Sequence, residues 1–397
     1  MTASLVDLGD VAAINPRLPR EDKPGVTELV TFLPMAGVSE QSASIVETEL
    51  RPYAEVAKGY TPFQRGDFLI AKITPCFENG KLALATDIPT ELGFGSTEFH
   101  VIRPGPDLDR EYLYYLMRSP YVRLAGEMKM KGAAGQRRVP AEFFAGFKIP
   151  LPPLSEQKRI AKILDAADAL RAKRRESLAQ LDALLQSTFL EMFGDPVENP
   201  KGWDMVEIGD LLETANYGTS KKASESLGAF PVLRMNNITY SGRWDFSSIK
   251  YVDLDDKEQN KHLVYRGQIL FNRTNSRELV GKTAAYREEK PMAFAGYLVR
   301  GVPNARRSNA EYIAAYMNLP QTKQRLQNMC KNIVGMANIN AKEFQKIPIP
   351  SPPKDLQDRF ANAVERVLSH RKTQDKQLSD LKILFDSLQN RAFAGQL

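Results

Sequence analysis

The sequence contains few of the residues that build disulfide frameworks, metal centres and membrane spans. Its 397 residues include two cysteines and three histidines. Cys76 and Cys330 lie far apart and show no metal-ligand spacing, which argues against a disulfide-stapled secreted scaffold and favours the reducing cytoplasm as the protein's location. The segment from Met1 to Val11 contains Asp7 and Asp10 and no long apolar run. We therefore expect neither a signal peptide nor a membrane span.

Catalytic motifs are also scarce. The three histidines stand in unrelated contexts and suggest no pairing of a nucleophile with a base. The Pro-Pro pairs follow Leu151 and Ser351, so neither fits the Asx-Pro-Pro-aromatic motif of an amino-methyltransferase. The segment 281–283 (GKT) resembles the end of a phosphate-binding loop, but Ser276 stands where that loop needs a glycine. We expect no catalytic residue, no metal site and no cofactor of the chain's own.

The composition is that of a folded globular protein. Hydrophobic residues make up 43% and charged residues 26%, with a formal net charge of +6 and a pI of about 9.0. A modest basic excess fits a polyanionic partner, although a slightly basic surface gives the same numbers.

The chain contains an internal repeat at an offset of roughly 200 residues. Matches this numerous, in order and nearly in register, indicate a duplicated module. Two copies of one module suggest that two similar sites are recognised at once. The paired segments include 6–10 with 206–210, 66–69 with 267–270, 80–81 with 281–282, and 111–113 with 311–313.

Each half has the same internal order. Short strand-like runs at 67–73 and 268–273 precede helical stretches near Glu111 and Glu311. A proline-rich segment follows, at 149–153 in the first half and at 347–353 in the second. Because proline fixes φ and disfavours helix in the preceding residue, we expect these segments to be stiff, extended connectors.

A long helix follows each connector. Ser155 is the expected N-cap of the first helix, with Glu156 in its first turn, and Asp355 has the same expected role in the second helix. Apolar residues spaced alternately four and three apart predict a coiled-coil seam. Polar residues interrupt both seams at matching places, Arg171 and Arg174 in the first helix and Arg371 and Gln374 in the second. The main seam residues are Ile160, Leu164, Leu178, Leu181, Leu185, Phe360, Val364, Leu378, Leu381 and Phe385.

A single helix buries only a narrow stripe, so each helix needs a partner. We expect the two helices to pair antiparallel with one another, since they match in length and register. The alternative is that each helix packs on its own module or on another protein.

The segment 150–161 (PLPPLSEQKRIA), leading into a leucine-rich helix, resembles the specificity subunits of type I restriction-modification systems. The duplicated layout extends this resemblance over the whole chain. The second copy departs from the motif, since Lys354-Asp355-Leu356-Gln357 replaces Leu-Ser-Glu-Gln.

The resemblance implies a mixed α/β fold. Two similar target-recognition domains, related by a pseudo-two-fold axis, are separated by two long helices that form an antiparallel coiled coil. The implied boundaries are a first target-recognition domain at 1–151, a helical region at 152–195, a second target-recognition domain at 196–351 and a second helical region at 352–397.

The resemblance also implies a non-catalytic subunit that recognises double-stranded DNA. Each recognition domain reads one half of a bipartite, asymmetric target, and the helices dock two methyltransferase (modification) subunits. S-adenosylmethionine and ATP then belong to partner subunits, the latter to restriction subunits (translocase and endonuclease) where these join the complex. No membrane partner is expected.

Candidate DNA contacts are taken from polar segments, because bases and phosphates are read by Arg, Lys, Asn, Gln, Ser and Thr. The segment 272–277 follows an apolar run, and 72–75 is its counterpart. A second pair is 129–138 and 331–338, and 234–237 is a third possibility. Each could instead be a solvated loop. The candidate residues are Lys72, Thr74, Lys131, Gln136, Arg137, Arg138, Arg234, Asn236, Asn272, Arg273, Asn275, Arg277 and Asn338.

Two rival functions remain open at this point. One is a coiled-coil scaffold that joins two protein partners and never binds DNA, which salt-dependent binding of duplex DNA would distinguish. The other is a stand-alone methyltransferase or nuclease, against which a failure of the isolated chain to bind S-adenosylmethionine would count.

Overall fold

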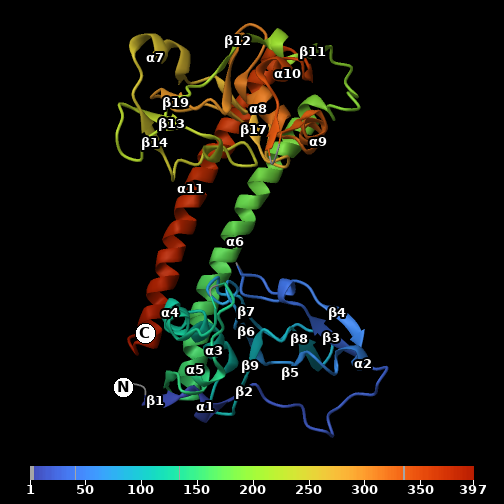
Figure 1. Ribbon diagram of the computed structural model, residues 1–397, viewed down its shortest axis with the longest axis vertical. Coiled ribbons are helices and arrows are strands. Elements are labelled where there is room, and N and C mark those ends of the chain that lie inside the picture. The colour runs from blue at the N-terminus through green and yellow to red at the C-terminus, as the bar shows by residue number, and fades with distance from the viewer. Residues whose placement is uncertain (1–3, 41, 134, 334–335) are drawn as a thin grey trace. The chain divides into compact units, whose positions relative to one another are not determined.

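The computed structural model describes residues 4–40, 42–133, 135–333 and 336–397; Ala134, Val334 and Gly335, which belong to the candidate loops, lie outside the described residues. The chain divides into two compact units, described separately below. The first comprises Met1–Arg175 with Gln377–Leu397, and the second comprises Glu176–Lys376. The long helices α6 (Leu154–Phe193) and α11 (Lys354–Phe393) each contribute one part to each unit (Figure 1).

The first unit contains two four-stranded sheets and a two-stranded one, with the strand orders β2-β9-β6-β7, β4-β3-β8-β5 and β1-β10. Its remaining helices are short. The bounds are β1 (Ser4–Asp7), α1 (Leu8–Val11), β2 (Ala12–Ile14), β3 (Leu29–Leu33), β4 (Glu49–Pro52), α2 (Tyr53–Val56), β5 (Thr61–Gln64), β6 (Phe68–Ala71), β7 (Leu82–Leu84), β8 (Leu92–Gly95), β9 (Phe99–Pro104), α3 (Arg110–Met117), α4 (Pro120–Lys129), α5 (Ala141–Ala145) and β10 (Lys148–Leu151).

The second unit repeats this topology, with the orders β12-β20-β16-β18, β14-β13-β19-β15 and β11-β23, and adds the three-stranded ribbon β17-β22-β21. The bounds are β11 (Met205–Glu207), β12 (Leu212–Tyr217), β13 (Phe230–Leu233), β14 (Lys250–Val252), α7 (Asp256–His262), β15 (Leu263–Val264), β16 (Ile269–Asn272), β17 (Thr274–Asn275), β18 (Thr283–Ala285), β19 (Met292–Phe294), β20 (Leu298–Pro303), α8 (Ala310–Asn318), α9 (Pro320–Met329), β21 (Lys331–Ile333), β22 (Met336–Asn338), α10 (Ala341–Gln345) and β23 (Pro348–Pro350).

Equivalent residues build equivalent elements in the two units. The buried strands β6 and β16 follow tight turns at Gly66 and Gly267, whose φ values of +89° and +85° favour glycine. The helices α3 and α8 begin where Asp109 and Asn309 accept hydrogen bonds from backbone amides of the first turn. The strands expected at 67–73 and 268–273 and the helices expected near Glu111 and Glu311 are confirmed.

The proline-rich segments are extended, as expected, but they are more than connectors. Each one forms a strand, β10 or β23, that pairs antiparallel with the first strand of its own half, β1 or β11. Tyr112 and Tyr312 donate hydrogen bonds from their hydroxyl groups to the carbonyls of Pro150 and Pro350, at 2.8 and 2.7 Å. The segments are therefore held in place by the modules that precede them.

The expectation that Ser155 caps the first long helix was wrong. The helix already begins at Leu154, because the Pro153 carbonyl accepts from the amides of Glu156 and Gln157. Asp355 likewise lies inside the first turn of α11 rather than before it. In both helices the carbonyl of the preceding proline, Pro153 or Pro353, accepts from amides of the first turn, so each helix starts before the expected capping residue.

A buried glutamine fixes the start of each long helix to its module. Gln157 accepts from the Asp109 amide (2.8 Å) and donates to the carbonyls of Asp107 and Pro152 (2.9 and 2.8 Å). Gln357 makes the same three bonds in the second unit, with Asn309, Arg307 and Pro352. Both side chains are completely buried. The duplication seen in the sequence thus extends to individual hydrogen bonds.

The long helices run antiparallel within each unit. In the first unit, the start of α6 packs with the end of α11, where Ile160 and Leu164 share a core with Phe385 and Ala392. In the second, the end of α6 packs with the start of α11, with Phe189 and Phe360 ring centroids 5.5 Å apart. The expected helix pairing is confirmed. The same cores contain residues of the modules, so helix pairing and packing on the module occur together.

The predicted seam residues are buried or half-buried. Leu181, Leu185, Leu378 and Leu381 are half-buried, and the other six are buried. Polar seam residues make local contacts, since Arg171 lies over the Phe385 ring (4.2 Å) and Arg371 donates to the Leu178 carbonyl (2.9 Å).

Candidate nucleic-acid interface

In the first unit the strand β6 ends in a backbone frame that joins three segments. The Lys72 amide donates to the Glu98 carbonyl (2.8 Å), and the Lys72 carbonyl accepts from the Val139 amide (2.9 Å). Ile73 pairs with Arg138 in an antiparallel bridge. Two segments that the sequence separates by more than sixty positions thus meet at one edge, where both were predicted to contact DNA.

The second unit contains the same frame at the end of β16. The Arg273 amide donates to the Tyr297 carbonyl (3.0 Å), and the Arg273 carbonyl accepts from the Ile339 amide (2.9 Å). Thr274 pairs with Asn338. We call these sets the first frame (72–74, 98 and 137–139) and the second frame (273–275, 297 and 337–339). Their hydrogen bonds are equivalent, whereas the side chains that they carry differ.

The first frame brings together all of its predicted residues. Lys131 and Arg138 exchange two backbone hydrogen bonds (2.9 and 2.8 Å), and the Thr74 amide donates to the Arg137 carbonyl (3.0 Å). Gln136 lies directly beside them on the same turn and is exposed, as are Lys131 and Arg137. Together with Lys72 these residues form one polar edge.

Two carboxylates accompany the cations of the first frame. Arg138 makes a bidentate ion pair with Glu98, through Nε (2.9 Å) and Nη2 (2.8 Å). Glu78 accepts from the Thr74 hydroxyl (2.7 Å) and lies 3.6 Å from the Arg137 guanidinium. The bond from Arg138 holds the pKa of Glu98 below its usual value. The net charge of this edge is therefore smaller than its arginines and lysines suggest.

The second frame has a different chemistry. Arg273 is half-buried over the Tyr217 ring (4.9 Å), and its guanidinium donates to Asn338 Oδ1 (3.4 Å). Asn338 in turn donates to the Thr274 hydroxyl (2.8 Å). Among the residues that the structure describes, no acidic side chain is bonded to the side chains of this frame. An arginine–aromatic stack and a ladder of amides take the place of the ion pairs.

The other predicted residues of the second unit lie at different places. Asn272 is buried and donates to the carbonyls of Thr274 and Tyr297, while Asn275 donates to Asn272 Oδ1 (2.8 Å), so Asn272 belongs to the interior of the frame. Arg277 is exposed on the turn that follows.

Arg234 and Asn236 lie away from the frame in sequence and bonding. Arg234 donates to the carbonyl of Ser248 (2.9 Å), within its own loop, and Asn236 is exposed. The structure describes no bond between these residues and the second frame.

Sequence reasoning missed the acidic and aromatic members of the frames. Glu98 and Tyr297 occupy equivalent positions, and Tyr217 provides the ring beneath Arg273. These residues are neither cations nor amides, and they carry no aliphatic hydroxyl group, so they lie outside the residue types from which the candidate contacts were predicted. The available signal was positional, since Glu98 and Tyr297 directly precede the strands β9 and β20, which pair with β6 and β16.

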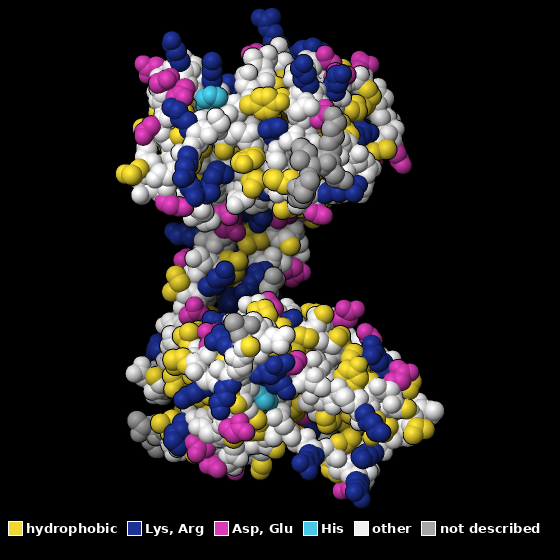
Figure 2. All heavy atoms as spheres, in the orientation of Figure 1, with side chains coloured by type: hydrophobic (Ala, Val, Ile, Leu, Met, Phe, Trp, Pro, Cys, Tyr) yellow, Lys and Arg dark blue, Asp and Glu magenta, His cyan; other side chains and the backbone are white. Residues whose placement is uncertain are grey.

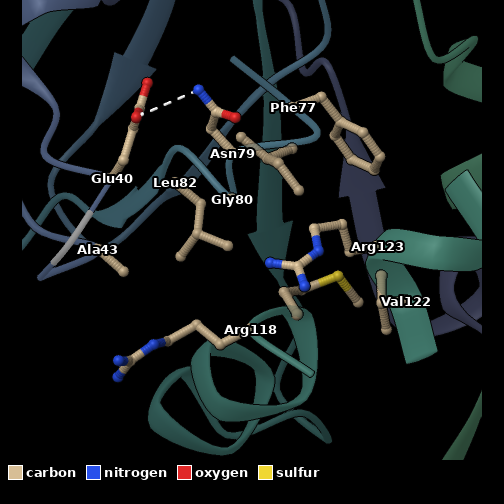
Figure 3. A pocket seen from close by; sticks show the side chains of 11 residues that line it. Glu40, Ala43, Phe77, Asn79, Gly80, Leu82, Arg118, Val122 and Arg123 are labelled. Carbon is tan, nitrogen blue, oxygen red and sulfur yellow. Dashed lines mark hydrogen bonds between the residues drawn. The ribbon is translucent and has the colours of Figure 1, made fainter. Parts of the chain in front are cut away.

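A pocket of about 160 Å³ lies elsewhere in the first unit (Figure 3). Asn79 donates to Glu40 on one side (3.3 Å), and Arg118 and Arg123 approach from the other. Arg118 is already paired with Asp168 (2.6 Å). In the second unit, Lys323 occupies the position on α9 that Arg123 occupies on α4. It lies over the Tyr240 ring and donates to the Tyr240 carbonyl. We assign no ligand to this pocket.

Lys282 and Lys81 have a structural role rather than a phosphate-binding one. Each donates from its ammonium group to a backbone carbonyl of its own unit, Met235 (2.8 Å) and Met35 (3.1 Å). Gly281 has a φ of +88°, a backbone conformation that favours glycine.

Charges of both signs are mixed on the visible surface of each unit (Figure 2). In the described part of the chain, no group of His, Cys, Asp and Glu has a geometry that could hold a metal ion. The described helices include none whose length and apolarity would let it cross a membrane.

Comparison with known proteins identifies the family. A model described as the type I restriction modification DNA specificity domain matches residues 4–181 and 200–380. The EcoAI specificity subunit of Escherichia coli is 41% identical over 178 residues, covering 44% of this chain and 29% of the relative. The EcoKI specificity subunit of Escherichia coli K12 is 25% identical over 329 residues, covering 78% of this chain and 70% of the relative. The chain thus spans less than a third of the length of the more similar of these two relatives.

Solved structures share the fold. A chain from a study of the assembly and conformational transition of the type I restriction-modification system is 20% identical, with a TM-score of 0.60 and coverage of 100% of this chain and 98% of that one. The type I S subunit from M. genitalium is 16% identical, with a TM-score of 0.54 and coverage of 98% and 96%. With two matched segments and this mixed α/β fold, the chain belongs to the family of type I restriction modification DNA specificity domains.

Proposed function

We propose that the chain is the DNA-recognition subunit of a type I restriction-modification complex, and that each unit reads one half of a bipartite, asymmetric target. The observation that carries this proposal is the frame built twice. Because the backbone hydrogen bonds are the same and the exposed side chains differ, the two frames present two unlike sets of donors and acceptors from one scaffold. Base edges are discriminated by such sets, whereas phosphates are not.

The long helices are proposed to dock two modification subunits. Exposed large apolar residues on them support this, since Leu170, Leu184, Ile383 and Leu384 are 46–66% exposed. A partner subunit that packed on these helices would remove such apolar surface from water, which favours docking. In this proposal the chain itself is non-catalytic. The partner subunits bind S-adenosylmethionine and methylate adenine, and restriction subunits that use ATP can join the complex.

The proposal is tested by assembling the chain with its modification subunits and measuring the affinity for duplex DNA over a range of salt concentrations. We expect binding that weakens linearly on a logarithmic scale with salt, and methylation of adenines only at sites with two separated sequence elements. The modification subunits alone serve as the control. Absence of duplex binding by the assembled complex would favour the coiled-coil scaffold instead.

A further inference from the structure

We infer that Arg138 is a specificity-determining residue of the first unit, and that Glu98 orients its guanidinium to recognise a guanine edge in the major groove. This inference rests on the proposed function. It goes further because it assigns one base class to one side chain and a positioning role to a carboxylate.

The Arg138 guanidinium has hydrogen-bond donors that its protein partners leave free. A guanidinium has five N–H groups, one on Nε and two on each Nη. For Arg138, Glu98 takes the Nε donor and one Nη2 donor, and the Gln136 carbonyl takes one Nη1 donor (3.2 Å). Two donors remain, one on each terminal nitrogen. A guanine offers two acceptors, O6 and N7, and paired donors of one arginine bind both.

The Arg138 guanidinium is accessible and its orientation is constrained. The Arg138 side chain is 43% exposed, while that of Glu98 is 25% exposed. The backbone at Arg138 is fixed by its pairing with Lys131 and Ile73. A guanidinium held at both its backbone and its inner edge loses less conformational freedom when it binds a base, so the interaction discriminates better.

The Glu98 carboxylate favours a base over a phosphate as the partner of Arg138. A phosphate approaching Arg138 also approaches the Glu98 carboxylate, whose pKa is lowered and which is therefore ionised at neutral pH. The repulsion between the two anions offsets the attraction by the arginine. Guanine is neutral, so its acceptors meet no such repulsion. The ion pair therefore favours a base edge over the DNA backbone.

The second unit supplies an internal comparison. Its frame keeps the equivalent backbone bonds but has Asn338 in place of Arg138 and Tyr297 in place of Glu98. The side chain proposed to contact the base and the residue that orients it thus both differ between the two units. A substituted pair on an unchanged backbone is expected where two modules read different bases.

The experiment uses the full chain assembled with its modification subunits and the DNA target that this complex methylates. Each guanine of the two half-sites is replaced in turn by 7-deazaguanine, which lacks the N7 acceptor. We expect one position in one half-site where this replacement weakens binding of the wild-type complex. With Arg138→Ala the affinity for the unmodified target should fall roughly 5- to 150-fold, and the replacement at that position should have no further effect.

Glu98→Gln tests the positioning role. We expect poorer discrimination of guanine from adenine at that position, together with a steeper salt dependence, by about one counterion per complex, as Arg138 becomes free to contact phosphate. Glu91→Gln is the matched control, because Glu91 also pairs with an arginine of the first unit, Arg65 (2.6 Å), but outside the frame. It should leave both quantities unchanged.

The possible outcomes distinguish a failure of the inference on Arg138 from a failure of the proposed function. If Arg138→Ala reduces only the salt dependence and retains the sensitivity to 7-deazaguanine, Arg138 is a phosphate contact and the inference is overturned. The same holds if both variants behave like the wild type. If the wild-type complex does not bind duplex DNA at all, the proposed function fails first.

Discussion

The glutamine that fixes each long helix to its module gives the sharpest test of the fold. Gln357 is completely buried, and its three hydrogen bonds have lengths of 2.9, 3.1 and 2.9 Å. Gln357→Met keeps the side-chain volume while removing all three bonds. Each bond contributes about 0.5–1.5 kcal/mol net. We therefore expect the free energy of unfolding of the second unit to fall by about 1.5–4.5 kcal/mol.

The assay follows tryptophan fluorescence during urea denaturation and heating. The only two tryptophans, Trp203 and Trp244, both belong to the second unit. A loss of about 3 kcal/mol corresponds to a decrease in Tm of roughly 6–12 °C for a unit of this size. Gln180→Met is the control, because Gln180 is exposed on α6 and donates only to Glu176 on the same helix.

A decrease below about 0.5 kcal/mol for Gln357→Met would refute this reasoning, since it would mean that the three bonds make no net contribution to the stability of the second unit. The equivalent glutamine of the first unit can be tested by hydrogen exchange. In Gln157→Met, the Asp109 amide should lose its protection against hydrogen exchange, because Gln157 is the acceptor of that amide.

Three further predictions concern charged residues. Arg118→Ala removes the shorter of two ion pairs of the largely buried Asp168, which keeps Arg171 at 3.3 Å, and should destabilise the first unit by about 1.5–3 kcal/mol in chemical denaturation. Arg110→Ala, in an exposed pair, should change it by less than about 1 kcal/mol. Burial lowers the pKa of Lys323 from 10.5 to about 8. Between these pH values the Lys323 side chain is protonated in the unfolded chain but not in the folded one, so the stability of the second unit should rise with pH more steeply in the wild type than in Lys323→Met. An equal pH dependence of unfolding in both proteins would contradict this. Arg277→Ala should reduce the salt dependence of DNA binding by about one counterion without changing the sequence preference, which the binding assay above measures directly.

The sequence predicted the architecture well because the duplication made each signal visible twice. Strands, short helices, connectors and the long seams appear at matching positions, and the helix pairing follows from period and length alone. The error at Ser155 arose because capping rules look for a polar side chain before the first turn, whereas both long helices here start directly after a proline whose carbonyl accepts first-turn amides. The burial of Gln157 and Gln357 was not predicted, since a glutamine in a helix is usually exposed. The available signal was that glutamine is the one residue that the segments 154–157 and 354–357 share.

The candidate interface could be predicted only in part. Polar segments after apolar strands pointed to 72–74 and 137–139, and the structure joins these segments through backbone bonds that no local pattern contains. Their contact with DNA stays a prediction. The partners of the cations depend on long-range pairing, so Glu98 and Tyr217 could not be assigned from spacing. Burial of Asn272 was equally hidden, because an amide in a polar run looks the same whether it supports the loop or faces solvent.

The central claim is that each unit reads its own half of one divided target, and mapping of methylated adenines tests it most directly. The map is made in cells that produce the modification subunits with the wild-type chain, with Arg138→Ala, or with Arg273→Ala. The account predicts a motif of two unlike elements separated by a fixed gap. Arg138→Ala should relax or abolish the requirement in one element, and Arg273→Ala should do so in the other. An undivided motif, or a substitution that changes both elements alike, would contradict the account.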